Sequence, residues 1–226
     1  FSYYAASLNR STEYPRLEGE QVADVCVIGA GFTGVSTALH LAERGYKVHI
    51  LEANRVGWGA SGRNGGQIIG GMSGESKLAK AIGAEGDRIV WDMRWAGHDI
   101  IRERVATYGI DCDLKWGYLD VAIKPRHLRG QQQEMEYLQR HGYAHPYQSL
   151  SAAETQELIG TDAYIGGLLN MGNGHLHPLN LCVGEAAAAV SLGAKICEQS
   201  PVRHIEHGAR PRVVTEHGAV TADAVV

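Results

Sequence analysis

The feature that most constrains this chain is a glycine motif placed between a short apolar run and a segment of small residues. The run DVCVIG (24–29) is rich in β-branched residues and ends in glycine, which is typical of a strand buried on both faces of a parallel sheet. Small and apolar residues from Thr33 to Arg44 predict a helix, and Gly45 follows where a helix-ending glycine belongs. A second apolar run, KVHILE (47–52), predicts another strand. The order indicates a βαβ unit.

Each glycine of the motif GAGFTG has a separate task. Gly29 allows a tight turn, Gly31 lets the backbone touch a pyrophosphate, and Gly34 lets the helix pack closely on the strand. The helix N-terminus offers free N–H groups to a phosphate. Glu52 lies 21 residues after Gly31 (52 − 31), where an acid accepts hydrogen bonds from ribose hydroxyls and repels a 2′-phosphate. The pattern predicts a dinucleotide other than NADP, and a turn that serves packing alone is the alternative.

A second glycine-rich segment runs from Val56 to Gly74. The chain holds 29 glycines in 226 residues, nearly twice the usual share of about 7%, and this segment is the densest part. A flexible linker would be polar with few anchors, whereas this segment carries bulky apolar residues that favour an ordered loop. These residues are Val56, Trp58, Ile68 and Ile69.

Residues 59–67, GASGRNGGQ, are small or carry polar groups. They could pass beneath the remainder of an extended cofactor, with Ser61, Arg63 and Asn64 offering donors to pyrophosphate and flavin oxygens. A mobile surface loop is the alternative. This segment, rather than the glycine motif, is what favours FAD over NAD.

The rest of the chain predicts a second subdomain followed by a return to short strands. The first twenty residues have no clear periodicity and are expected to form an arm. The final run TADAVV is apolar and has no turn or cap, so we expect the chain to be truncated there. The other predicted elements are a helix at 85–108, a strand at 116–124, a helix at 127–141 behind Pro125, a helix capped by Ser151 and Glu154, a strand at 164–170, a helix at 178–193, and β segments at 194–199, 201–206, 211–218 and 219–226.

Composition excludes several classes of function. The net charge of −4, with both signs mixed along the chain, provides no basic face for nucleic acid. No apolar run approaches about 20 residues, and no signal pattern begins the chain, so neither a membrane span nor secretion is expected. Four scattered cysteines lack C-x-x-C spacing, which favours reduced thiols in a cytoplasmic protein over a zinc site or disulfides.

Several residues could have a functional role, but a structural role is favoured for each of them. His175 and His177 have no third ligand nearby, so no metal is expected. Asp111 and Asp113 would share one face of a strand, where a solvated edge is favoured over a catalytic pair. Cys26 is expected in the core of the first strand. Three tryptophans could stack on a substrate but are expected in the core: Trp58, Trp91 and Trp95.

The segment 24–67, from DVCVIGAGFTG to SGRNGGQ, resembles the glycine/D-amino-acid oxidase (DAO) family of FAD enzymes, and most closely its gamma-glutamylputrescine oxidase branch. The likeness extends to SYYAAS (2–7), to residues 100–124 and to residues 172–206, and so covers essentially the whole chain.

The resemblance implies an α/β fold, α+β overall. A Rossmann-like FAD-binding domain with a parallel sheet would be joined to a substrate domain with an antiparallel or mixed sheet, incomplete at the C-terminus. The expected organisation is an N-terminal arm at 1–22, the first part of the FAD-binding domain at 23–108, the first part of the substrate domain at 109–170, and a return to the FAD-binding domain at 171–226.

The resemblance also implies oxidation of an amine C–N bond, giving an aldehyde, ammonia and, with oxygen as the expected acceptor, hydrogen peroxide. Gamma-glutamylputrescine or a related polyamine derivative is the expected substrate, in putrescine breakdown. A glycine- or sarcosine-type oxidase or dehydrogenase is one alternative. An inactive dinucleotide-binding fragment or subunit is another.

Carried over by position, the family pattern assigns cofactor contacts but no catalytic residue, since most substrate-binding residues of the family are expected beyond Val226. No histidine lies in 59–67, so flavin attachment through that loop is not expected. The pyrophosphate contacts would be Gly29, Gly31, Phe32, Thr33 and Gly34, the ribose contacts Glu52 and Ala53, the contacts along the pyrophosphate and flavin Ser61, Arg63, Asn64, Gly65, Gly66 and Gln67, and the adenine contact the backbone of Val202.

Overall fold

The structure is a computed structural model that describes residues 2–226, so Phe1 of the predicted arm 1–22 lies outside the described residues. The chain forms two compact units. The first unit holds residues 2–66, Glu103–Cys112 and His177–Val226. The second unit holds Gln67–Arg102 and Asp113–Leu176. Residues 67–102, predicted within the FAD-binding segment 23–108, therefore group with the second unit.

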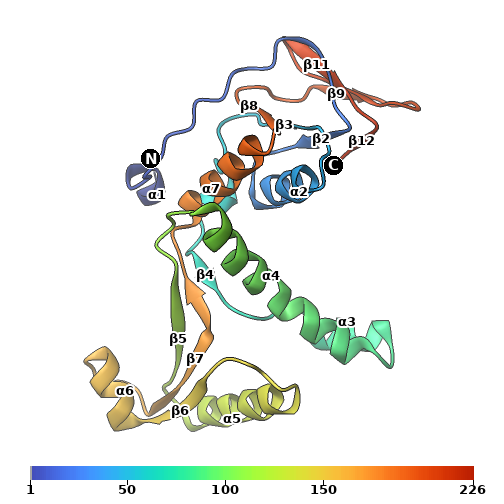
Figure 1. The fold of residues 1–226 in the computed structure, drawn as a ribbon. Helices are drawn as coiled ribbons and strands as arrows, with labels where there is room; N and C mark the ends of the chain where they lie inside the picture. Colours follow the sequence, from blue (N-terminus) through green and yellow to red (C-terminus); the bar gives the residue numbers. More distant parts are fainter. Residues whose placement is uncertain (1) are drawn as a thin grey trace. The chain divides into compact units, whose positions relative to one another are not determined.

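The first unit contains the predicted parallel sheet (Figure 1). Its strand order is β12-β2-β3-β8, and every neighbouring pair is parallel. Helix α2 (Phe32–Glu43) follows β2 and leads to β3, which is the predicted βαβ unit. Gly45 follows the helix with φ +82°, a conformation that favours glycine. The strands are β2 (Val25–Ile28), β3 (Val48–Leu51), β8 (Lys195–Cys197) and β12 (Ala224–Val225).

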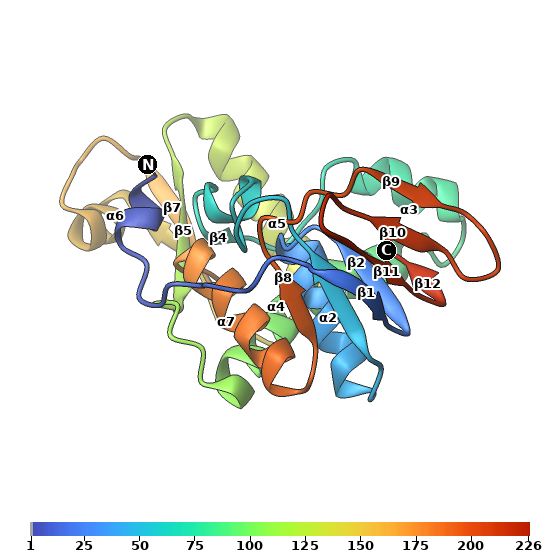
Figure 2. The same cartoon turned by 90° about the horizontal axis from the view of Figure 1, so that it is seen from above.

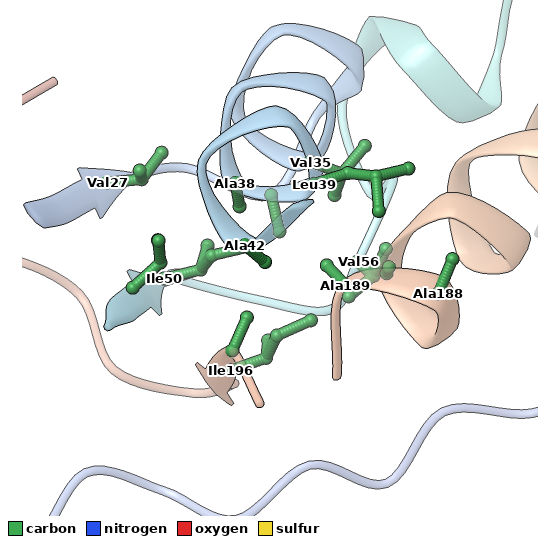
Figure 3. Packing of buried hydrophobic residues seen from close by; sticks show 14 of the residues in the cluster. Val27, Val35, Ala38, Leu39, Ala42, Ile50, Val56, Ala188, Ala189 and Ile196 are labelled. Carbon is green, nitrogen blue, oxygen red and sulfur yellow. The ribbon is translucent and has the colours of Figure 1, made fainter. Parts of the chain in front are cut away.

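Helix α2 and helix α7 (Pro178–Ser191) supply the core that covers this sheet (Figure 3). Ala38 and Ala42 of α2 are small, so the helix lies close to the sheet, while Leu39 and Ile50 fill the layer and are fully buried. Burial of each such large side chain contributes about 1.5–3 kcal/mol. Packing of α2 on the sheet thus holds the N-terminal end of the helix, and the glycine motif that precedes it, at the end of β2.

The first unit contains a second sheet, which includes β1 (Gly19–Val22) and has the strand order β1-β11-β10-β9 (Figure 2). Strands β9 (His204–Glu206), β10 (Arg212–Val214) and β11 (Gly218–Thr221) are antiparallel, whereas β1 and β11 are parallel. The predicted core position of Cys26 is confirmed, because it is fully buried in a cluster with residues of β10 and β11, and burial raises the pKa of its thiol to about 12. The thiol is therefore unreactive.

The prediction of one strand over 219–226 is wrong. Residues 218–221 form β11 of the second sheet, and 224–225 form β12 of the parallel sheet. The division occurs because the Asp24 carbonyl accepts hydrogen bonds from Asp223 N at 3.0 Å and Ala224 N at 3.1 Å. These bonds draw the end of the chain from one sheet to the other.

The second unit is built on antiparallel strands around β7 (Gly166–His175), as predicted for the second subdomain (Figure 1). Strand β5 (Lys115–Ala122) pairs along one side of β7, and β4 (Gln67–Ile68) and β6 (Tyr147–Ser151) also pair with it. The helices are α3 (Glu75–Ile82), α5 (Pro125–Arg140) and α6 (Ala152–Ile159), together with most of α4 (Gly86–Tyr108), which continues into the first unit.

Two short helices depart from the predictions. Helix α1 (Tyr3–Ala6) lies in the arm, which was expected to lack regular structure, and α3 was not predicted. Gly74 stands at the N-cap of α3 with φ +83° and makes no side-chain capping bond. The sequence therefore lacked the Ser, Thr, Asp or Asn signal that marks most helix starts.

The predicted cap of α6 is confirmed and carries a testable consequence. Ser151 Oγ accepts from Glu154 N, and the Glu154 carboxylate accepts from Ser151 N, forming a capping box. We expect Ser151→Ala to lower the free energy of unfolding by about 1 kcal/mol, because one helix N–H loses its acceptor. Urea unfolding near neutral pH measures this, and an unchanged midpoint would contradict it.

The same cap depends on pH. Hydrogen bonds from the Ser151 hydroxyl and then from its backbone amide hold the pKa of Glu154 below its ordinary value of 4.5. Because the pKa is lowered in the folded state, the stabilisation is present above the unfolded value and is lost as the pH falls through the folded one. The difference between wild type and Ser151→Ala should therefore shrink when the unfolding is repeated at about pH 3.

Candidate functional site

The glycine turn between β2 and α2 brings backbone groups together more closely than side chains would allow. Gly29 has φ +99° and donates its N–H to Leu51 O at 2.8 Å. A Cβ on Gly34 would lie 1.9 Å from Gly29 O, and one on Gly31 would lie 2.9 Å from Ser61 Oγ. The first turn of α2 therefore lies in close contact with the end of β2. This close packing is the role predicted for Gly34.

The carboxylate of Glu52 lies at this turn. Its Oε2 accepts from Ala30 N at 2.8 Å, and its Oε1 accepts from Asn54 N at 2.8 Å. Each carboxylate oxygen has two acceptor sites, so both oxygens retain capacity for hydroxyl donors. Glu52 is half-buried, and it has the chemistry predicted for a ribose contact.

Ser61 joins the glycine-rich loop to the start of α2. Phe32 N, the first amide of the helix, donates to Ser61 Oγ at 2.9 Å, while the N-cap Gly31 makes no side-chain capping bond. The loop therefore crosses the helix N-terminus, where partial positive charge favours an anion. Ser61 and Gly31 lie together, as a pyrophosphate site would require.

Asn64 and Arg63 make bonds within the loop itself. Asn64 Nδ2 donates to the carbonyls of Ala60 and Ser61, and its Oδ1 accepts from Gly66 N at 2.8 Å. Arg63 Nε donates to Trp58 O at 2.8 Å, and its guanidinium lies 5.0 Å from the Trp58 ring centroid. Arg63 and Asn64 were predicted to donate to the cofactor, and the structure shows them donating to carbonyls of their own loop. The loop contains a short 3-10 turn, η1 (Ala60–Gly62).

Ala53 lines a cavity of about 260 Å³ in the first unit, beyond the end of β3. Val202 is partly buried and packs on the cluster that contains Cys26, and its neighbour Pro201 also lines the cavity. Gln67 lies in the second unit, where it pairs with His175. The other cavity residues are Arg16, Gln199, Ser200, Thr215, Glu216 and His217.

Two contacts were missed by sequence reasoning. The Ala30 carbonyl, inside the glycine motif, accepts from Gly57 N at 2.9 Å and from Cys182 Sγ at 3.5 Å. Glu198, which follows β8, is buried and accepts from Val56 N at 2.8 Å. A glutamate directly after a buried strand was the available signal for the second contact, but its partners are distant in sequence.

The two histidines were expected in a turn or at a helix start, which is confirmed for His177 but wrong for His175, the last residue of a strand. His177 is the N-cap of α7, where its Nδ1 accepts from Asn180 N at 3.0 Å. His175 ends β7 and is exposed. Within residues 2–226 no group of three or more His, Cys, Asp or Glu side chains could hold a metal ion.

The aspartates and one tryptophan require correction. Asp111 and Asp113 are exposed, but neither is on a strand, and Asp113 has φ +51° and pairs with Lys115 at 3.0 Å. Trp58 is 52% exposed rather than in the core. Trp95 is 9% exposed and lies 5.8 Å from Trp91, ring centroid to centroid, which agrees with a packing role.

The glycine turn, the adjacent acid and the loop across the helix N-terminus have the chemistry that a site for the ADP portion of a dinucleotide requires, so the residues present fit that group. The family model of FAD-dependent oxidoreductases, DAO, matches residues 24–226. The chain belongs to this family, whose cofactor is FAD.

Two curated relatives match over all of this chain. It is 42% identical to gamma-glutamylputrescine oxidoreductase of Escherichia coli over 226 residues, and 43% identical to a probable oxidoreductase, OrdL, of Haemophilus influenzae over 228 residues. Each alignment covers 100% of this chain and 53% of the relative. The chain thus spans about half the length of the curated relatives it matches.

Solved structures agree with the family. L-amino acid deaminase from Proteus myxofaciens aligns with TM-score 0.78 and 26% identity, over 95% of this chain and 47% of that one. Glycine oxidase from Geobacillus kaustophilus aligns with TM-score 0.68 and 26% identity, over 91% of this chain and 54% of that one.

Among residues 2–226, no helix combines the length and apolar character that crossing a bilayer requires.

Proposed function

We propose that this chain supplies the FAD site of an oxidoreductase that acts on an amine C–N bond. The observation that carries the FAD site is the meeting of three segments at one point: the glycine turn, the Glu52 carboxylate bonded to Ala30 N at 2.8 Å, and Ser61 bonded to the first amide of α2. The amine is supported by the 42% identity to gamma-glutamylputrescine oxidoreductase. FAD, when bound, supplies the electron acceptor for the oxidation.

The residues have separable roles in this proposal. Backbone groups from Gly29 to Gly34 bind the pyrophosphate, and Glu52 with Ala53 orients the ribose. Ser61 to Gln67 line the pyrophosphate and flavin, and the Val202 backbone pairs with adenine. The segments 23–108 and 171–226 would hold FAD and 109–170 would face the substrate, with the grouping of 67–102 in the second unit as the point to test.

For the substrate we propose gamma-glutamylputrescine or a related polyamine derivative, oxidised to an imine that water hydrolyses to an aldehyde and ammonia, while oxygen is reduced to hydrogen peroxide. The support is the 42% identity, over the whole of this chain, to gamma-glutamylputrescine oxidoreductase. The resemblance to glycine oxidase makes a small amino acid the competing substrate class.

A substrate panel tests the proposal on the protein expressed from its complete open reading frame. We expect a flavin absorption spectrum, and bleaching of that spectrum under anaerobic conditions by gamma-glutamylputrescine but not by glycine, sarcosine or putrescine. Peroxide release on admitting air tests oxygen as the acceptor. Bleaching by glycine or sarcosine instead would replace the polyamine reading, and a colourless protein that does not take up FAD would contradict the whole proposal.

Glu52→Gln is expected to weaken FAD binding by about tenfold or more. The amide can accept through only one of the two atoms that now accept from Ala30 N and Asn54 N, and its N–H₂ would face an N–H donor. Titration of FAD fluorescence measures the dissociation constant. Glu18→Gln, an exposed change in the same unit, serves as the control and should leave it unchanged.

A further inference from the structure

Glu198 carries a buried carboxylate whose partners come from two distant segments. It follows β8 directly and is 3% exposed. Its Oε1 accepts from Val56 N at 2.8 Å and from Thr12 Oγ1 at 2.7 Å, and its Oε2 accepts from Tyr14 N at 3.3 Å. Removing the carboxylate would leave these donors without their acceptor in a buried place, which costs more than a hydrogen bond contributes on average.

One set of partners belongs to the segment between the proposed ribose acid and the glycine-rich loop. Next to Glu198, Gln199 N donates to Asn54 O at 3.0 Å, and Ser200 N donates to Glu52 O at 2.8 Å. Gln199 has φ +50°, a conformation uncommon for a residue other than glycine. The end of β8 therefore holds residues 52–56 along their backbone, and Glu198 makes the last of these bonds.

The other set of partners belongs to the predicted N-terminal arm 1–22, in the part that precedes β1, residues 2–18. Besides Thr12 and Tyr14, the arm donates Leu17 N to Ser200 Oγ at 2.9 Å, and that hydroxyl donates to Glu198 O at 2.8 Å. Glu198 and Ser200 thus bind the arm at three successive places, at residues 12, 14 and 17.

A cavity of about 480 Å³ is lined by the arm, the loop and α7. Its lining includes Leu8 and Thr12 of the arm, Val56 and Trp58 of the loop, and Leu179 of α7. The first part of the arm is held elsewhere, since Asn9 donates to Asn180 Oδ1 at 3.2 Å and to Asp111 O at 2.6 Å. Glu198 is distinct because one carboxylate oxygen accepts from both the arm, at Thr12, and the loop segment, at Val56.

We propose that Glu198 is a positioning residue that couples the N-terminal arm to the FAD site. The inference rests on the proposed function. Glu198 acts through Val56, whose neighbour Gly57 donates to Ala30 O at 2.9 Å in the glycine motif. The arm, the loop and the glycine motif then form one hydrogen-bonded assembly, and losing the arm's attachment loosens the loop against which FAD lies.

Three variants of the complete open reading frame test the coupling. Glu198→Gln keeps the shape but places an amide N–H₂ opposite donors, whereas Thr12→Val removes only the Thr12 hydroxyl bond and leaves the Tyr14 bond to Glu198 in place. Glu13→Gln is the control, because Glu13 lies in the same arm between two of the bonded residues and is exposed. FAD affinity is measured by fluorescence titration, and attachment of the arm by limited proteolysis with and without FAD.

We expect Glu198→Gln to weaken FAD binding by tenfold or more, and Thr12→Val to weaken it by about fivefold, the effect of one hydrogen bond. Both variants should release the arm to protease sooner than wild type, and FAD should slow that cleavage, since coupling between two sites is reciprocal. Glu13→Gln should match wild type in both measurements.

The outcomes separate this inference from the proposed function. Wild type that takes up no FAD overturns both. Wild type that binds FAD, with Thr12→Val equally tight although its arm is cleaved faster, overturns only the coupling. If Glu198→Gln fails to fold, Thr12→Val decides the question by itself, because its change is confined to the arm.

Discussion

Gly34→Ala is expected to abolish FAD binding and to lower the melting temperature by about 6–12 °C. The new Cβ would lie 1.9 Å from Gly29 O and 3.0 Å from Gly29 C, and both are backbone atoms that no side-chain rotation can move. Helix α2 must then shift away from β2. Overpacking of this kind costs about 3 kcal/mol, and each kcal/mol lowers the melting temperature of a chain this long by about 2–4 °C.

Gly59→Ala is the matched control for that variant. Gly59 belongs to the glycine-rich loop and has φ −76°, and a Cβ there would meet nothing within 4 Å. It should leave both the melting temperature and the flavin spectrum unchanged. If Gly34→Ala retained FAD as well as Gly59→Ala does, close contact between helix and turn would not be what the site requires.

Arg104→Met is expected to lower the free energy of unfolding by about 3–5 kcal/mol. Arg104 Nη1 donates to Glu185 Oε1 at 2.7 Å and to Ser36 Oγ at 2.9 Å, and both charged side chains are 4% exposed. Burial already raises the pKa of Glu185, with the Arg104 hydrogen bond opposing that rise. Without the arginine, a buried carboxylate would remain uncompensated between α2, α4 and α7.

Two further variants separate the buried pair from arginine loss in general. Arg104→Met combined with Glu185→Met should recover most of the stability, because neither charge remains buried. Arg210→Met removes an exposed pair with Asp223 at 2.6 Å and should change stability little. Urea unfolding curves compare the four proteins. A double variant no more stable than Arg104→Met would mean that packing, rather than charge, explains the loss.

Local signals predicted the parallel half of the fold well. The βαβ unit was placed within a residue or two, because the glycine turn, the small-residue helix and the apolar strands are encoded within 24–52. The capping box of α6 was read from Ser151 and Glu154 alone. Each of these features depends on residues close together in the sequence.

What the sequence did not predict depends on distant partners. Strands β11 and β12 were predicted as one strand, because the group that divides them is distant in sequence. Asp223 donates to the carbonyl of Asp24, which lies 199 residues earlier (223 − 24). The amide of Asn64 was assigned to the cofactor, but its bonds to Ala60 and Ser61 follow from the conformation of the loop. The roles of the predicted cofactor residues stay predictions until FAD binding is measured.

The strand order β12-β2-β3-β8 has a consequence for how the chain is made. The two central strands leave the ribosome early, but β8 begins 144 residues after β3 ends (195 − 51), and β12 follows later still. At a synthesis rate of about 5–20 residues per second, about 7–30 s pass between the synthesis of β3 and that of β8. During that interval both edges of the β2–β3 pair are open to pairing with other nascent chains, so shielding by chaperones should matter most in this window.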